Sequence, residues 1–450
     1  MKKKILIGGG ITLVVGFLVF LIIYNINNGE EKQNDSSTGV ATVDFSSYEE
    51  TEVTSNSNVN ITSAGVYNIT NDISNGSITI NTTGDVKLIL DGVTITNESG
   101  PCIKVISASN VYIEIKGTNY LKSSTTEEYN GTIYAESDLL LLGDGTLNIE
   151  SNIDGIVTKD DLQIDSGTYN IISSDDGIVG RDSIQINNGT ITITSGGDGL
   201  KSTNEEKGVI DINGGTLNIV SSKDGIQSIT DLNINGGTIN IKTGSGSATS
   251  SSNSNWRNSG DTDSMKGIKT EQNLYINGGT IDINSEDDSI HSNGNVTIKG
   301  GTITASSGDD GIHADKDVSI KDGKITITKS YEGIEGANIT VDGGDISVTS
   351  SDDGFNAAGG DGSTMNRPGA NNTYSSGTTY TLTINGGKIY VNASGDGLDS
   401  NGNIFITGGT IFVDGPTNSG NGALDYGDGG SYKFEITGGT LIAVGSSGMA

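Results

Sequence analysis

The chain has very few of the residues that staple or kink small folds. Its 450 residues include one cysteine, three prolines, one tryptophan and two histidines, and aromatic residues make up 5%. The lone Cys102 excludes an internal disulfide framework and predicts a buried structural thiol. Helical periodicity is missing outside residues 5–23, which excludes a helical domain elsewhere in the chain.

Basic residues are scarce as well. Lysine and arginine number 25 against 56 acidic residues, and the formal net charge is −31. A field of this sign opposes the binding of nucleic acid or of any bare polyanion, so an acidic ligand would need a cation in between. Charged residues make up only 18%, and isoleucine and valine recur throughout, so we expect an ordered chain.

One long hydrophobic run stands at the N-terminus. Three lysines precede residues 5–23, an uncharged stretch that is long enough to cross a bilayer at about 1.5 Å per residue. We expect residues 1–24 to be an uncleaved membrane anchor that leaves the rest on the extracellular face of a bacterial cell membrane. A cleaved signal, which would leave the protein secreted, is the alternative. Residues 25–44 are polar and aperiodic and indicate a flexible linker.

The sequence Asp-Asp-Gly-Ile, or a near relative, returns every 22 residues along much of the chain. A second corner reads Asn-Gly-Gly-Thr-Ile or similar, and between the corners Ile and Val alternate with Thr, Asn and Ser. Glycine at both corners is expected to supply positive φ. A fixed period of this length indicates one unit stacked on itself, so we predict an all-β solenoid, a parallel β-helix. The Asp-Gly corners are residues 153–156, 175–178, 197–200, 223–226, 287–290, 309–312, 331–334, 352–355 and 395–398.

Departures from this period divide the chain into parts. The period is blurred over residues 45–152, as expected of an N-terminal capping part, and is regular over 153–450. Two insertions, 244–264 and 357–378, adjoin the Asp-Gly corner. Long loops along one edge of a solenoid usually build its binding face.

Stacking the repeat would also stack acid on acid. Two carboxylates about 5 Å apart repel by roughly 1 kcal/mol in water and by more at a lower dielectric. Ca²⁺ accepts six to eight oxygen ligands in irregular geometry and would relieve this repulsion. The alternative is that Asp precedes Gly because the pair makes good turns, which suits Asp154 but not the doubled acids. The predicted calcium ligands are Asp287, Asp288, Asp309, Asp310, Glu332, Glu335, Asp352, Asp353, Asp396 and Asp399.

Several other side chains are candidates for contacts with a sugar. His291 and His313 lie 22 residues apart and should stack, either as a structural pair or as substrate contacts. Trp256, with Arg257 beside it, lies on a polar loop, and Tyr331 lies in an acidic coil. An exposed aromatic ring in such a place can stack on a sugar ring.

Two lysines share the column of the histidines. Lys201 and Lys269 are the obvious proton-abstracting bases if the protein is a lyase. Otherwise they are solvated countercharges to the acids.

Four consecutive corners resemble a bacterial cell-surface carbohydrate-binding family. They are residues 287–294, 307–315, 330–336 and 351–359, and segments near Tyr67 and Leu90 match its N-terminal part. The resemblance covers about residues 45–450. It implies a right-handed parallel β-helix similar to that of family-9 polysaccharide lyases, with calcium-loaded members associated with polygalacturonate and cellulose binding. It adds Asp315 and Asn356 to the predicted calcium ligands.

The chain departs from the lyases at the corner that binds their catalytic calcium. The lyases use an Asp-Asp-Gly-Phe-Asp-like corner, an aspartate from an adjacent coil and a lysine base. Here Asn356 replaces the last aspartate of residues 352–356, residues 395–399 lack the first, and no lysine stands at a matching position beside them. We therefore expect calcium-assisted binding rather than elimination.

Three functions follow from these features. The first is an extracellular protein that binds acidic plant-type polysaccharide, pectate or polygalacturonate with cellulose as a further candidate, through Ca²⁺. The second is a calcium-dependent polysaccharide lyase that acts by β-elimination. The third is a structural surface protein or adhesin in which calcium only stiffens the solenoid.

Overall fold

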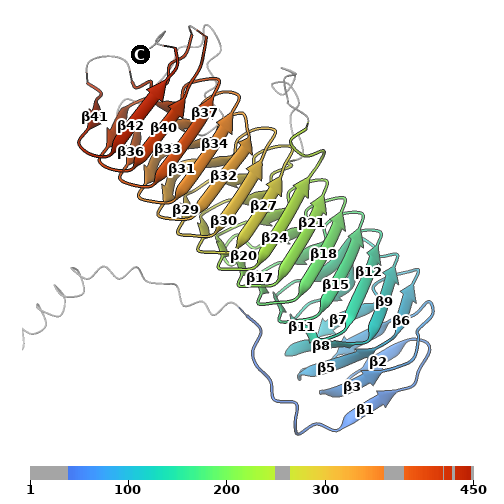
Figure 1. The fold of residues 1–450 in the computed structure, drawn as a ribbon. Helices are drawn as coiled ribbons and strands as arrows, with labels where there is room; N and C mark the ends of the chain where they lie inside the picture. The colour runs from blue at the N-terminus through green and yellow to red at the C-terminus, as the bar shows by residue number, and fades with distance from the viewer. Residues whose placement is uncertain (1–38, 249–263, 359–379, 419, 428–430, 447–450) are drawn as a thin grey trace, which may run out of the picture. The chain divides into compact units, whose positions relative to one another are not determined.

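The chain forms a parallel β-helix in the computed structural model (Figure 1), which describes residues 39–248, 264–358, 380–418, 420–427 and 431–446. Named strands in these ranges pair only in parallel, and these ranges contain no helix. Each coil contributes one strand to each of three columns. The predicted all-β parallel solenoid is therefore confirmed.

The first column follows the Asp-Gly corners. Its strands are β2 (Val59–Ile61), β4 (Ile78–Asn81), β7 (Ile103–Ser107), β10 (Gly131–Ala135), β13 (Asp154–Thr158), β16 (Ile178–Gly180), β19 (Leu200–Ser202), β22 (Ile226–Ser228), β25 (Ile268–Thr270), β28 (Ile290–Ser292), β31 (Ile312–Ile320), β33 (Ile334–Val341), β35 (Phe355–Ala357) and β38 (Leu398–Ser400).

The second column precedes the Asn-Gly-Gly corners, and the long strands β31 and β33 continue from the first column into it. Its other strands are β1 (Glu50–Val53), β3 (Gly65–Ile69), β5 (Val86–Asp91), β8 (Asn110–Lys116), β11 (Asp138–Gly143), β14 (Asp161–Ile164), β17 (Ser183–Ile186), β20 (Val209–Ile212), β23 (Leu232–Ile234), β26 (Leu274–Ile276), β29 (Val296–Ile298), β36 (Thr381–Ile384), β39 (Asn403–Ile406) and β41 (Phe434–Ile436).

The third column forms a sheet of its own. Its strands are β6 (Thr94–Asn97), β9 (Thr118–Ser123), β12 (Thr146–Ser151), β15 (Thr168–Ser173), β18 (Thr190–Ser195), β21 (Thr216–Ser221), β24 (Thr238–Thr243), β27 (Thr280–Asn284), β30 (Thr302–Ser306), β32 (Lys324–Lys329), β34 (Asp345–Ser350), β37 (Lys388–Ala393), β40 (Thr410–Asp414) and β42 (Thr440–Val444).

Apolar side chains from all three columns fill the interior. Ile193, Ile219 and Ile241 pair in register on consecutive coils and are almost fully buried. Such short strands cannot bury an apolar face alone, but stacking them gives one continuous core. Cys102 lies in this core as a free thiol, as expected, and burial raises its pKa to about 12.

The two corners need glycine for different reasons. The second glycine of the Asn-Gly-Gly corner has positive φ, as in Gly237 (φ 90°). The expectation of positive φ is wrong for the Asp-Gly corner. A Cβ on Gly225 would collide with Ile241 and would lie 2.5 Å from the Gly267 carbonyl oxygen, so close stacking of the coils excludes a side chain there. Ser289 stands at this corner position in one coil, in which the residue aligned with Ile241 and Ile283 is the smaller Ala305.

The predicted N-terminal capping part and the end of the predicted linker both lie within the described ranges. Residues 45–152 supply β1 to β12, which already belong to the three columns. From the predicted flexible linker, Val40 and Val43 pack against Tyr112 and Leu140, and the Val40 N–H donates to Gln163 Oε1 (2.9 Å). The linker prediction is therefore wrong for its last residues, because two apolar side chains there find an apolar patch on the outside of the second column.

Some predictions fall on residues that the structure does not describe. The predicted anchor, residues 1–24, and the pair Trp256 and Arg257 lie outside the described ranges, as does most of each insertion. Among the residues that are described, no helix has the length and apolarity to span a membrane.

Candidate functional site

The acids that precede the corner glycines, called here the corner acids, form a ladder of hydrogen bonds. One carboxylate oxygen of each corner aspartate accepts the backbone N–H of the corner residue in the next coil, and Glu332 forms no such bond within the described residues. The Asp198 N–H donates to Asp176 Oδ1 (2.7 Å), the Asp224 N–H to Asp198 Oδ1 (2.9 Å), and the Glu332 N–H to Asp310 Oδ1 (3.1 Å). These contacts satisfy amides that the corner would otherwise leave unpaired. The ladder explains the recurrence of aspartate, and it leaves the second oxygen of each carboxylate for another partner.

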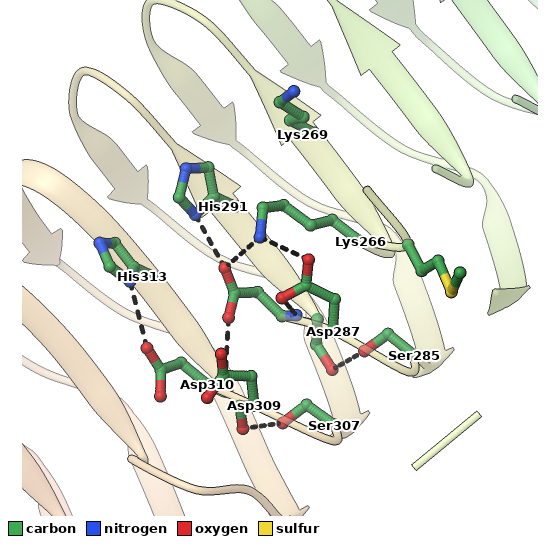
Figure 2. A network of polar contacts seen from close by, with 12 residues as sticks. Lys266, Lys269, Ser285, Asp287, His291, Ser307, Asp309, Asp310 and His313 are labelled. Carbon is green, nitrogen blue, oxygen red and sulfur yellow. Dashed lines mark hydrogen bonds and ion pairs between the residues drawn. The ribbon is translucent and has the colours of Figure 1, made fainter. Parts of the chain in front are cut away.

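The residues three places after each corner-acid position form a second stack, called here the companion column. In β25, β28 and β31 these are Lys269, His291 and His313, paired in direct register. The same register continues into β33, β35 and β38, where the corresponding residues are Glu335, Asn356 and Asp399. Figure 2 shows Lys269, His291 and His313 on successive coils. The companion column therefore changes from basic to acidic along the β-helix.

Lysine side chains pair with several of the corner acids in the earlier coils. Lys201 Nζ lies 3.2 Å from Asp176 Oδ2 and 2.7 Å from Asp198 Oδ2. Burial opposes the charge of this lysine, but the two carboxylates raise its pKa. A raised pKa is the opposite of what a general base needs, so Lys201 is a poor candidate for a lyase base.

Lys266 has the same role in the next part of the stack and was not identified from the sequence. It stands before Gly267, where most coils carry an acid, and its Nζ lies 2.8 Å from both Asp287 Oδ2 and Asp288 Oδ2 (Figure 2). Burial would raise the pKa of Asp288, but Lys266 and His291 hold it well below the usual range. This pair of predicted calcium ligands already has a cation of the protein beside it.

The two histidines lie against corner acids, with ring centroids 4.8 Å apart. His291 Nδ1 lies 2.8 Å from Asp288 Oδ2, and its Nε2 lies 2.8 Å from Asn293 Oδ1. His313 Nδ1 lies 3.1 Å from both Asp310 Oδ2 and Glu335 Oε2. Both nitrogens of each ring therefore face side-chain oxygens of acidic or amide residues.

Burial would lower the pKa of His313, but its contacts with the surrounding carboxylates raise it. One of these contacts is to Asp315, whose Oδ1 lies 3.4 Å from Nε2. The predicted stacking of the histidines is confirmed, and their contacts are with acids of the protein. Asp309, one place before its corner acid, belongs to the same crowded group, and burial together with Asp288 raises its pKa to about 7.

The later coils have acids without such partners. Within the described residues, Glu332, Asp353, Asp396 and Asp399 form no ion pair with a lysine, arginine or histidine. Burial and then the Asp310 charge raise the pKa of Glu332 to about 10. Burial and neighbouring acids raise the pKa of Asp353 to about 7 and that of Asp399 to about 8. The raised pKa values mean that these carboxyls keep protons to a higher pH than exposed carboxyls do, unless a cation from solution neutralises them.

Asn356 lies in the middle of this acidic group. It is 9% exposed, and its Nδ2 donates to Glu332 Oε2 (2.7 Å). Its Oδ1 is buried and has no hydrogen-bond partner, which costs about 1–3 kcal/mol for an ordinary polar group. Asp399 is the register partner of Asn356 in the next coil. A buried oxygen without a donor, among carboxylates, fits a hard cation.

Tyr331 and Asp352 lie at the edge of the same group. The Tyr331 ring is 43% exposed, and a hydrogen bond from its hydroxyl to Asp352 raises its pKa. The ring therefore remains accessible to a ligand next to the acids. Lys269, the other predicted lyase base, pairs with Glu271 (3.3 Å) in an earlier coil.

The metal-free protein should lose stability as pH rises from about 5 to about 9. The carboxyls of Glu332, Asp353 and Asp399, with pKa values of about 10, 7 and 8, bind protons in the folded state that they release when unfolded, where the pKa is about 4. The folded state then holds more protons, so the free energy of unfolding falls with rising pH. Thermal unfolding in EGTA across this range measures the effect, and a Tm that rises or stays level would contradict it.

Comparisons with known proteins show the family of the chain. The class defined by the fold is a parallel β-solenoid with stacked acids along one corner. A family profile described as "Carbohydrate-binding domain-containing protein" matches residues 55–311, more than half of the chain. The chain belongs to this carbohydrate-binding family.

Two individual proteins are similar over part of their length. A carbohydrate-binding domain-containing protein of Acetivibrio thermocellus is 32% identical over 119 residues, which are 24% of this chain and 42% of that protein. The chain thus covers less than half of the length of this relative. A solved structure of a polysaccharide lyase-like protein from C. thermocellum, a gadolinium derivative, is 29% identical and has a TM-score of 0.43, with 50% of this chain and 89% of the other covered.

Proposed function

We propose that the protein binds acidic polysaccharide through Ca²⁺ held by the acidic group of the later coils. The residues that would hold the ion are Glu332, Glu335, Asp353, Asn356, Asp396 and Asp399. The observation that carries this proposal is the change along the companion column, from Lys269 and the histidines to Glu335, Asn356 and Asp399. In the earlier coils, cations of the protein pair with Asp176, Asp198, Asp287, Asp288 and Asp310. Within the described residues, no such cation pairs with Glu332, Asp353, Asp396 or Asp399.

The donor set supports calcium over other metals. All the candidate atoms in the later coils are carboxylate or amide oxygens, which hard cations prefer, and Asn356 Oδ1 is an oxygen that lacks a partner. A bound divalent cation would neutralise carboxyls whose pKa values are otherwise raised. The earlier acids Asp287, Asp288, Asp309, Asp310 and Asp315 have Lys266 or a histidine beside them, so they are weaker candidates.

The negative charge of the protein explains why an acidic polysaccharide would need a metal ion in order to bind. A protein of formal charge −31 repels a polyuronate, and calcium that retains open coordination positions can bridge the two sets of carboxylates. Pectate or polygalacturonate fits this chemistry. The exposed Tyr331 would add an aromatic contact beside the ion. We further propose that binding occurs outside the cell, as residues 1–24 suggest.

Retention on immobilised polygalacturonate tests the proposal. The protein should be retained in calcium buffer and released by EGTA, because the polysaccharide contacts the protein through the ion. Magnesium should restore retention poorly, since it demands near-ideal octahedral geometry and keeps its waters. Retention that EGTA leaves unchanged, or no retention in calcium, would overturn it.

Elimination chemistry is not favoured by the positions of the lysines. Lys201 is held by two carboxylates and Lys269 by one, both in coils before the histidines. A base must reach the proton that it abstracts. Both lysines share the companion column with Glu335 but lie several coils before it. Binding without cleavage is therefore the function that the site supports best.

A further inference from the structure

The outer face of the third column becomes apolar in the last three described coils. Strands β37, β40 and β42 lie side by side (Figure 1) and place Tyr390, Phe412 and Ile442 in direct register along the middle of this face, called here the central row. These side chains are 43%, 39% and 49% exposed, and Val444, two residues after Ile442, is 57% exposed. We call these four residues the apolar patch. On the strands from β12 to β34 the central row is polar, and its members are Asn148, Asn170, Thr192, Asn218, Asn240, Asp282, Thr304, Thr326 and Ser347.

The interior of the β-helix does not use the side chains of the apolar patch. The inward residues of β37 and β40 include Ile389, Val391, Ile411 and Val413, which are at most 2% exposed and fill the interior. Polar residues occupy the central row on earlier coils of the same fold, so the fold does not require apolar residues there. A contiguous group of exposed apolar side chains is typical of an interaction surface. The apolar patch therefore indicates a surface that another molecule covers.

The charges beside the apolar patch are balanced. The outward positions of β37, β40 and β42 carry one base, Lys388, and one acid, Asp414. Lys388 stands two residues before Tyr390 and Asp414 two residues after Phe412, so the two charges lie on opposite sides of the central row. The net charge of the chain is −31, but exposed charges more than about 8 Å apart are largely screened at physiological ionic strength. An acidic protein can therefore approach this patch without strong local repulsion.

The ammonium group of Lys388 is available to a partner. Its side chain is 69% exposed and lies 3.6 Å from Asp345 Oδ1, and the Asp345 side chain is 57% exposed. An ion pair between two such exposed groups contributes little to stability. Lys388 can therefore turn toward an acid of another molecule with little loss.

We propose that a second copy of this chain packs on the apolar patch and forms a dimer with two-fold symmetry. A two-fold axis that lies in the interface and runs along the β-helix places the Lys388 side of one copy opposite the Asp414 side of the other. The two apolar patches meet in the middle, with one ion pair on each side of them. Lys388 and Asp414 lie on adjacent coils about 4.8 Å apart, an offset that a lysine side chain can span.

A second copy suits this patch better than a partner that is only basic or only acidic. Such a partner would satisfy one of the two charges and oppose the other, whereas the same patch turned about the two-fold axis satisfies both. The surface is also a regular sheet, and two sheets pack face to face about 10 Å apart with their side chains in between. The dimer uses a different surface from the corner acids and does not depend on calcium.

Sedimentation velocity of the full chain over a concentration series tests the proposal, with EGTA present and with residues 5–23 held in a nonionic detergent in every sample. The unaltered chain should shift from monomer to dimer as its concentration rises. The variant Tyr390→Asn/Phe412→Thr should associate about a hundredfold more weakly or worse, because it removes both aromatic side chains from the centre of the interface. Asparagine and threonine stand in the central row on earlier coils, so this variant should fold, and circular dichroism checks this.

The matched control is Tyr120→Asn. Tyr120 belongs to the central row on β9 and is 53% exposed, but its register partners are the polar residues Thr94 and Asn148. Loss of this isolated ring should leave the association unchanged. The control therefore separates the apolar patch from any general tendency of exposed aromatic rings to associate.

Exchange of the two charges tests the two-fold geometry. Lys388→Glu places two acids opposite each other, and Asp414→Lys places two lysines opposite each other, so each change alone should weaken association by about tenfold. The double variant Lys388→Glu/Asp414→Lys restores opposite charges and should associate within about threefold of the unaltered chain.

Three results would overturn the proposal. The first is an unaltered chain that stays monomeric throughout the concentration series. The second is association that Tyr390→Asn/Phe412→Thr leaves unchanged, which would place the contact elsewhere on the chain. The third is a double charge variant that associates more weakly than either single variant, which would show that Lys388 and Asp414 do not face each other. None of these results bears on retention by polygalacturonate, so failure of this proposal and failure of the calcium proposal are distinguishable.

Discussion

Replacing Asp353 and Asp399 together by asparagine should abolish the calcium response of the protein and its binding to polygalacturonate. The change removes two carboxylates from the acidic group around Asn356 and keeps their size. Asparagine still offers an oxygen to the Asp396 N–H, which donates to Asp353 Oδ1 (2.6 Å), so the corner ladder remains. Calcium affinity should fall by at least about tenfold, because the number of charged ligands sets the affinity of such sites.

Two measurements follow this variant. Calorimetric titration with calcium should show the loss of affinity, and retention on polygalacturonate in calcium should fall to the level seen in EGTA. In EGTA at about pH 8, the variant should be more stable than the unaltered protein, because it no longer confines two crowded carboxyls whose pKa values are about 7 and 8.

The matched control is Glu205→Gln/Glu206→Gln. Both glutamates are exposed, and the control changes the net charge by the same amount as the Asp353 and Asp399 variant. It should bind calcium and polygalacturonate normally. If both variants lose binding alike, the effect is one of overall charge, and the acidic group of the later coils is not the calcium site.

The fold could be predicted from the sequence because one sequence repeat corresponds to about one coil of the β-helix. Apolar alternation places Ile193 and Ile219 inside, and glycine corners allow close stacking, so the register follows from counting residues. The same counting places His291 above His313 and Glu335 beside Asn356. Predictions that depend on which residue lies in which coil therefore hold.

Predictions about charge are less complete, because they depend on side chains that meet through space. Lys266 follows an insertion that interrupts the period, and its ammonium group reaches Asp287 and Asp288 in the next coil. The insertion hides the fact that Lys266 occupies a corner-acid position. Within the described residues, some corner acids have a lysine or histidine partner and the later ones do not. This division becomes visible only when the positions of the Lys266 and Lys201 side chains are known.

The corner ladder is the second feature that the residues alone do not reveal. The choice between turn formation and metal binding assumes that each aspartate has one role. In the structure Asp310 has two, since its Oδ1 accepts the Glu332 N–H and its Oδ2 faces His313. Conversely, the alternation of threonine and asparagine outside the third column is plain in the sequence.

Replacing Lys266 by methionine should destabilise the protein and make it dependent on calcium. The Lys266 side chain is 14% exposed, and its ammonium group pairs with the buried Asp287 and Asp288. Its removal leaves Asp287 without its ion-pair partner and Asp288 with His291 alone. Breaking a buried ion pair in this way costs about 3–5 kcal/mol. Denaturant unfolding in EGTA should show a loss of this size, and calcium should recover part of it by entering the space that the ammonium group leaves.

The control for this variant is Lys324→Met, which removes an exposed lysine from the third column. It should change stability by less than about 0.5 kcal/mol, as for surface positions away from buried charges. An unchanged stability of Lys266→Met in EGTA would show that Lys266 is not the counterion of these acids. A loss that calcium does not reverse would show that the lysine neutralises them but that their oxygens cannot hold an ion. If calcium does reverse the loss, the ammonium group of Lys266 takes the place in this coil that we propose for a metal ion in the later coils.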